Sequence, residues 1–132
     1  MGYYYDHLDP ELLAQLIVRA GRAGHQLRNH AHSLYNFGYP EIITIDVVAG
    51  EVEGLCRQMR AQIEKKHDIK YILREAVKTS VFIKGIITAK LPEYVHETDK
   101  FSFSEIGKMI DLMIQSFREA DQRINQAILK DS

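Results

Sequence analysis

Apolar residues recur at alternating steps of four and three along two long stretches of this 132-residue chain. In an α-helix this spacing gathers the apolar side chains on one face, and such a seven-residue repeat packs helices side by side. The pattern therefore predicts long amphipathic helices that bury their apolar faces against one another. The two stripes are Leu13, Ile17, Ala20, Gly24, Leu27, Ala31 and Leu34, and Ile106, Ile110, Met113, Phe117, Ala120, Ile124 and Ala127.

Local signals give the expected limits of four helices. Asp9 and Pro10 suit a helix start, because an Asp side chain accepts a free backbone N–H and Pro tolerates the first helical position. Ser102 and Glu105 have the spacing of a capping box. The β-branched run 42–45 could also suit a strand, but apolar residues continue beyond it at helical spacing. We expect helices over about residues 10–36, 41–66, 68–90 and 102–130.

Four amphipathic helices with short connections predict an all-α fold, with antiparallel helical hairpins forming a four-helix-type bundle. The length fits a single helical domain over residues 1–132. Such regular apolar stripes also favour a second copy of the chain, so we expect homodimerisation to complete or extend the bundle.

Composition limits the classes of partner. Seventeen Lys and Arg against eighteen Asp and Glu give a formal charge of −1, so we expect no nucleic-acid partner. No apolar run approaches the roughly 20 residues that span a bilayer, and the N-terminus does not resemble a signal peptide, so we expect no membrane segment. The single cysteine, Cys56, cannot form an internal disulfide, which favours a reducing, cytoplasmic setting.

A polar run in the first predicted helix carries the candidate chemistry. His25 lies beside the apolar stripe on the flank that faces water, and Arg28, three residues on, shares that surface. A neutral imidazole is a competent nucleophile near pH 7. Phosphoryl transfer mostly needs positioning and charge neutralisation, which a guanidinium can supply. The run therefore suits a histidine that meets a phosphoryl group.

The five residues His25-Gln26-Leu27-Arg28-Asn29 resemble the phosphoacceptor box of sensor histidine kinases, which lies on the first helix of a dimeric four-helix bundle. The resemblance implies that His25 accepts the γ-phosphoryl group of ATP and passes it to an aspartate on a response-regulator receiver domain. Arg28 and Asn29 would orient the phosphate and the nucleotide-binding domain.

The chain departs from that family at two positions and lacks its nucleotide-binding motifs. Gln26 stands where the family usually has an acid that orients the histidine, and His30 stands where a proline often follows. The Asn-rich and Gly-rich boxes that bind ATP are absent, so we expect no cofactor in this chain. ATP and Mg²⁺ would enter only through a separate ATP-binding kinase domain.

A second box is a competing phosphoacceptor candidate. His67 and Asp68 have the acid in the expected place and are followed by Lys70. Asp68 is also explained as the N-cap of the third predicted helix.

Two other functions remain open. The chain could be a non-enzymatic dimeric interaction module whose histidines are incidental. Arg28 to His32 also looks similar to the motif of HEPN-type ribonucleases, although that family normally has at least four residues between Arg and His, and this chain has three. We expect no metal site, because His25 and His32 would lie roughly 10 Å apart along the helix.

Overall fold

The computed structural model describes residues 3–90 and 95–131, and every regular element within them is a helix. The predicted all-α bundle is confirmed, and the β-branched run 42–45 is helical. The long helices are α1 (Pro10–Ser33), α2 (Pro40–Glu64), α3 (Lys70–Lys90) and α4 (Lys100–Asp131), and the short 3-10 turns are η1 (Tyr3–Asp6), η2 (Tyr35–Phe37) and η3 (Glu97–Asp99).

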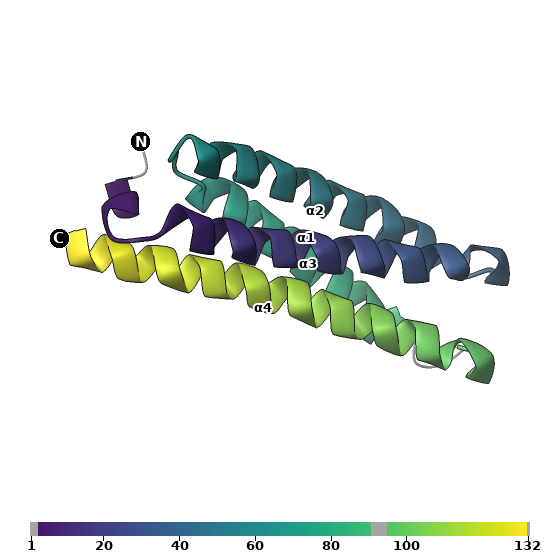
Figure 1. Ribbon diagram of the computed structural model, residues 1–132. Coiled ribbons are helices and arrows are strands. Elements are labelled where there is room, and N and C mark those ends of the chain that lie inside the picture. The colour runs from purple at the N-terminus through teal and green to yellow at the C-terminus, as the bar shows by residue number, and fades with distance from the viewer. Residues whose placement is uncertain (1–2, 91–94, 132) are drawn as a thin grey trace.

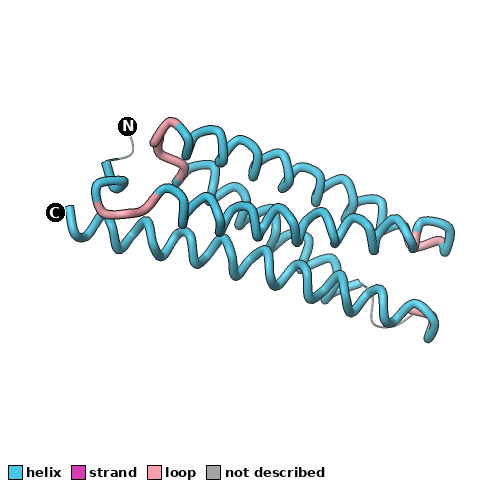
Figure 2. Tube along the Cα trace, viewed as in Figure 1, coloured by secondary structure: helices cyan, strands magenta, loops and turns pink. Residues whose placement is uncertain are grey.

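The four long helices form a ring in chain order. α1 packs against α2, α2 against α3 and α3 against α4, and a contact between α4 and α1 closes the ring. Figure 1 shows α1 running between α2 and α4, with α3 behind them. The connections lie at the two ends of the bundle (Figure 2). No helix in the described ranges combines the length and hydropathy needed to cross a membrane.

The core includes both apolar stripes expected from the sequence, together with buried residues of α2 and α3. All seven residues of the stripe from Leu13 to Leu34 are buried, and so are all seven of the stripe from Ile106 to Ala127. Burial of such side chains is the main stabilising contribution in a bundle, and truncating one Leu or Phe there typically costs about 2–5 kcal/mol. These stripes fix which side of α1 faces the core and which side is left for chemistry.

The first helix begins as expected and ends earlier. Asp9 is the N-cap, and its carboxylate accepts the backbone N–H of Glu11 at 2.9 Å. α1 ends at Ser33 rather than near residue 36, because the chain tightens into η2. Gly38 follows with φ +78°, a left-handed conformation that glycine adopts without strain.

The fourth helix begins differently from the prediction. The turn η3 runs directly into α4 at Lys100, so Ser102 lies inside the helix. The capping box predicted from Ser102 and Glu105 is therefore wrong.

An N-terminal contact fixes the start of α3. The Tyr4 hydroxyl donates to Asp68 Oδ1 at 3.0 Å and accepts the backbone N–H of Ile69 at 2.9 Å. Asp68 Oδ1 also accepts the N–H of Lys70 at 2.9 Å, which confirms its expected capping role. η1 is thereby attached to the α2–α3 connection.

Candidate functional site

His25 lies halfway along α1 on the side that faces α2 and solvent. Its side chain is 68% exposed, and its Nδ1 lies 3.9 Å from Oε1 of Glu53 on α2. The position follows from the sequence register, because Gly24 and Leu27 face the core on either side of it. The imidazole is accessible from solvent and has a carboxylate beneath one of its nitrogens.

Glu53 lies partly buried between α1 and α2, with 13% of its side chain exposed. Its Oε2 accepts from Nη1 of Arg28 at 3.3 Å. Its Oε1 is inaccessible to solvent and has no hydrogen-bond partner among the described residues. A buried acceptor without a partner costs about 1–3 kcal/mol. At 3.9 Å, Nδ1 of His25 lies beyond hydrogen-bond distance of this oxygen.

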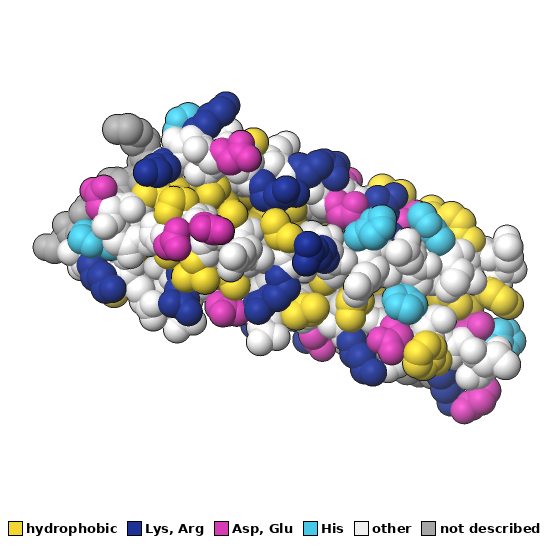
Figure 3. Space-filling model, viewed as in Figure 1, with side chains coloured by type: hydrophobic (Ala, Val, Ile, Leu, Met, Phe, Trp, Pro, Cys, Tyr) yellow, Lys and Arg dark blue, Asp and Glu magenta, His cyan; other side chains and the backbone are white. Residues whose placement is uncertain are grey.

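Three arginines lie around the groove that contains His25. Arg22 on α1 and Arg57 and Arg60 on α2 line a groove of about 440 Å³ whose apolar floor includes Ile17 and Cys56. In the described part of the chain these three guanidinium groups form no ion pair, unlike Arg19 and Arg28. Figure 3 shows several Lys, Arg and His side chains along this face of the molecule, with Asp and Glu side chains among them. The groove therefore has a positive potential that suits an anion.

A second carboxylate, Asp46 on α2, is the centre of a hydrogen-bond network with α1 and η2. Nε of Arg28 donates to Oδ1 at 2.9 Å. Nε2 of His32 donates to Oδ2 at 3.0 Å, and the Tyr35 hydroxyl donates to the same oxygen. Burial by itself would raise the pKa of Asp46, but the three hydrogen bonds outweigh it and hold the pKa below its ordinary value. Asp46 therefore stays ionised and fixes the direction of Arg28.

The residues predicted around His25 are only partly brought together. Gln26 is exposed and lines the same groove. Arg28 is turned toward α2, where its guanidinium contacts both Asp46 and Glu53. Asn29 is exposed, and its side chain forms no hydrogen bond within the described ranges.

The second candidate is separate from this site. His67 lies in the connection between α2 and α3, where its Nδ1 is 2.9 Å from Oε1 of Gln62. Asp68 contacts Tyr4 and caps α3. The acid that follows His67 therefore has structural partners of its own.

Cysteine and metal chemistry have no support at this groove. Cys56 is buried, and burial raises the pKa of its thiol to about 12, so it is not a thiolate near neutral pH. In the described ranges no three His, Cys, Asp or Glu side chains are grouped so that they could hold a metal ion.

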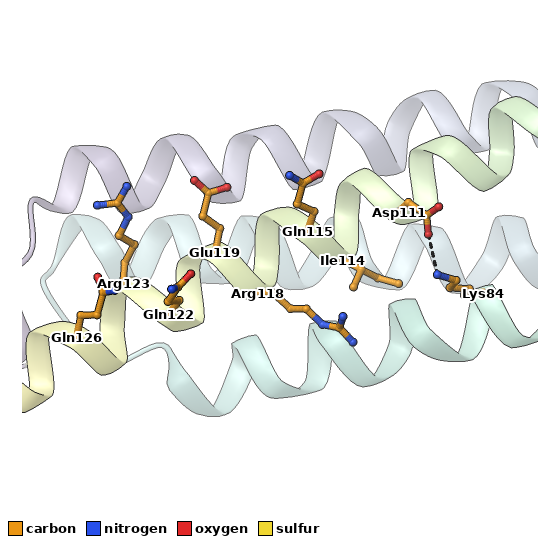
Figure 4. A pocket seen from close by; sticks show the side chains of 9 residues that line it. All are labelled: Lys84, Asp111, Ile114, Gln115, Arg118, Glu119, Gln122, Arg123 and Gln126. Carbon is orange, nitrogen blue, oxygen red and sulfur yellow. Dashed lines mark ion pairs between the residues drawn. The ribbon is translucent and has the colours of Figure 1, made fainter.

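A larger hollow, about 800 Å³, lies along α4 and does not form a comparable site. Figure 4 shows that its side chains point in different directions: Arg118 extends toward α3, whereas Glu119 and Arg123 point to the opposite side of α4. Lys84 and Asp111 are paired there at 2.9 Å. Divergent and neutralised charges do not act together on one ligand.

Comparison with known protein families, with curated proteins and with solved structures gives no match to this chain.

Proposed function

We propose that the chain is a histidine phosphotransfer module in which His25 is the phosphoacceptor. The observation that carries the proposal is the position of the exposed His25 imidazole, whose Nδ1 lies 3.9 Å from the buried Oε1 of Glu53. That oxygen has no hydrogen-bond partner among the described residues. Glu53 supplies from α2 the acid that Gln26 cannot supply from the next position of α1.

The carboxylate selects the reactive nitrogen. When Glu53 accepts a hydrogen bond from Nδ1–H, the proton stays on Nδ1 and the lone pair lies on Nε2. That lone pair attacks the phosphorus of the donor, a P–N bond forms, and the bond to the leaving group breaks with its electron pair. The Nδ1–H of the product remains hydrogen-bonded to Glu53, which stabilises the positive charge of the ring.

The surrounding charges support transfer of an anion. Arg22 lies three residues before His25 on the same side of α1, and Arg57 and Arg60 approach from α2. Their guanidinium groups, which form no ion pair among the described residues, can neutralise a phosphoryl group next to the ring. Arg28 acts through Glu53 as a positioning residue, because its guanidinium holds Oε2 and leaves Oε1 for His25.

The partners follow from this role. We propose that a separate ATP-binding kinase domain, with Mg²⁺, or a phosphorylated receiver domain supplies the phosphoryl group, and that a receiver aspartate takes it. The single cysteine fits a cytoplasmic location.

The test is intact-mass analysis after incubation with phosphoramidate, which donates its phosphoryl group and releases ammonia. We expect an acid-labile gain of about 80 Da, the mass of one phosphoryl group, in the native chain and its loss in His25→Ala. His67→Ala and His30→Ala are matched controls that should keep the gain. Loss of the gain in His67→Ala, with retention in His25→Ala, would overturn the assignment.

A dimeric interaction module is the second candidate, and exposed apolar side chains on the α2–α3 hairpin favour it. Ile43 and Val47 on α2 and Phe82 on α3 are each more than half exposed. Phe82 also lines an apolar groove of about 390 Å³ between these helices. We propose that a second copy of the chain covers this face. Light scattering should give a dimer that Val47→Glu or Phe82→Glu dissociates, whereas Phe101→Glu, a change at an exposed residue on α4, should not.

The ribonuclease prediction has less support from the geometry. Arg28 and His32 do meet, but they meet at the carboxylate of Asp46. Arg28 is also paired with Glu53. A guanidinium neutralised by two carboxylates is poorly placed to hold an RNA phosphate.

A further inference from the structure

The groove beside His25 combines two kinds of surface. Arg22, Arg57 and Arg60 give it three cationic groups without an ion-pair partner in the described part of the chain. Between them lies a floor made by Ile17, Val18, Gly21 and Cys56. Gly21 has no side chain to fill the bottom of the groove. A Cβ added at this position would lie 3.6 Å from Cβ of Cys56 and would occupy part of that space.

We infer that this groove is a binding site for a small phosphate ester that has an apolar body. Its volume, about 440 Å³, lies within the range of small-molecule sites. A guanidinium binds phosphate oxygens in a bidentate manner, and three of them at one groove favour a dianionic group. The apolar floor would contact the remainder of the ester. The binding is non-covalent and does not require transfer to His25, so this inference goes beyond the proposed function.

The charge balance of the groove distinguishes it from the other side of the molecule. Glu53 is the carboxylate that lines it, and its Oε2 is engaged by Arg28. Along α4, by contrast, Lys84 pairs with Asp111 and Glu119 pairs with Arg19. Arg118 and Arg123 form no ion pair among the described residues, but they point to opposite sides of α4 (Figure 4). A phosphate ester should therefore bind more tightly in the α1–α2 groove than in the hollow on α4.

The test is an NMR titration of the ¹⁵N-labelled chain with phenyl phosphate, with inorganic phosphate and phenol as separate probes. We expect saturable shifts of the Gly21 and Cys56 amides with phenyl phosphate, weaker binding of inorganic phosphate because it lacks the apolar contact, and little binding of phenol. Binding should weaken as salt is added, because salt screens exposed charges.

Variants separate this site from general surface charge. The double variant Arg57→Gln, Arg60→Gln should weaken phenyl phosphate binding at least tenfold. The matched double variant Arg74→Gln, Arg118→Gln removes two exposed arginines from the α3–α4 side and should change binding less than twofold. Equal weakening by both variants, shifts confined to α3 and α4, or the absence of saturation would overturn the inference.

One further variant distinguishes this inference from the phosphotransfer proposal. His25→Ala removes one side chain that lines the groove, so it should weaken phenyl phosphate binding less than the double variant Arg57→Gln, Arg60→Gln does, while abolishing phosphorylation at residue 25. Binding without phosphorylation of the native chain would refute phosphotransfer alone. Phosphorylation without binding would refute the ester site alone.

Discussion

Removing the Asp46 carboxylate should destabilise the bundle measurably, because this side chain links α2 to both α1 and η2. Asp46 is buried, with 9% of its side chain exposed, whereas 34% of Arg28 and 51% of His32 remain exposed. Charge-assisted hydrogen bonds contribute about 1.5–3 kcal/mol when buried, and exposed ion pairs contribute about 0.2–1 kcal/mol. The mixed exposure places the Arg28 bond at about 1 kcal/mol and the Asp46 network as a whole at about 2 kcal/mol.

Asp46→Ala should therefore lower the free energy of unfolding by about 2 kcal/mol. For 132 residues at about 2.1 cal/mol/K per residue, the entropy of unfolding is near 0.28 kcal/mol/K, so Tm should fall by about 7 °C. Urea unfolding followed by circular dichroism measures the first quantity, and a thermal scan measures the second.

A matched control and a double-mutant cycle make the test specific. Asp121 on α4 accepts only an exposed bond from Asn125 at 3.3 Å among the described residues, and Asp121→Ala should change stability by less than about 0.5 kcal/mol. Combining Arg28→Ala with Asp46→Ala should reveal a coupling energy of about 1 kcal/mol. A loss for Asp46→Ala no larger than that for Asp121→Ala would refute the argument that this network stabilises the bundle.

Three further predictions test the structure. The pKa of Asp46 is held below its ordinary value, so its stabilising effect is present above about pH 4 and is lost as pH falls through the folded pKa. The difference in free energy of unfolding between the native chain and Asp46→Ala, measured by urea unfolding, should therefore shrink between pH 6 and pH 3. An unchanged difference would contradict this. Gly107→Ala should raise the free energy of unfolding by about 0.8–1 kcal/mol, because an added Cβ meets nothing within 4 Å. Gly24→Ala should raise it by less, because its Cβ would lie 3.4 Å from Cγ of Glu53. Equal increases for the two variants would show that the Glu53 side chain moves aside without cost. Tyr4→Phe should lower the free energy of unfolding by about 1–3 kcal/mol, because the N–H of Ile69 loses its acceptor. Hydrogen exchange at the Ile69 amide should accelerate, and unchanged protection there would argue against the contact.

The apolar periodicity was sufficient to predict which faces of α1 and α4 are buried, because steps of four and three in a helix admit only one buried face. The helix ends were harder to predict. Ser102 and Glu105 have capping-box spacing, yet η3 already supplies a helical start at Lys100. Competing turns of this kind are decided by contacts outside the local sequence. One such contact is the hydrogen bond that the Tyr39 hydroxyl donates to Asp99 at 2.7 Å.

The candidate site could be predicted only in part. The register of α1 was enough to place His25 at the surface. Glu53, Arg57 and Arg60 come to the same groove through the register of α2 against α1, which no local pattern encodes. Asp46 did leave a signal, because it is a charged residue next to Ile45 within the buried stripe of α2. A charge at such a position requires partners, and Arg28, His32 and Tyr35 are those partners.

The most direct test of the central claim is to locate the phosphoryl group on the phosphoramidate-treated chain by tandem mass spectrometry and ³¹P–¹H NMR. Because Glu53 faces Nδ1 of His25, we predict a single phosphohistidine at residue 25 with the phosphorus on Nε2. Glu53→Gln should slow its formation, and Glu51→Gln, a change at an exposed residue of the same helix, should not. A phosphoryl group on another histidine, or on Nδ1 of His25, would contradict the account.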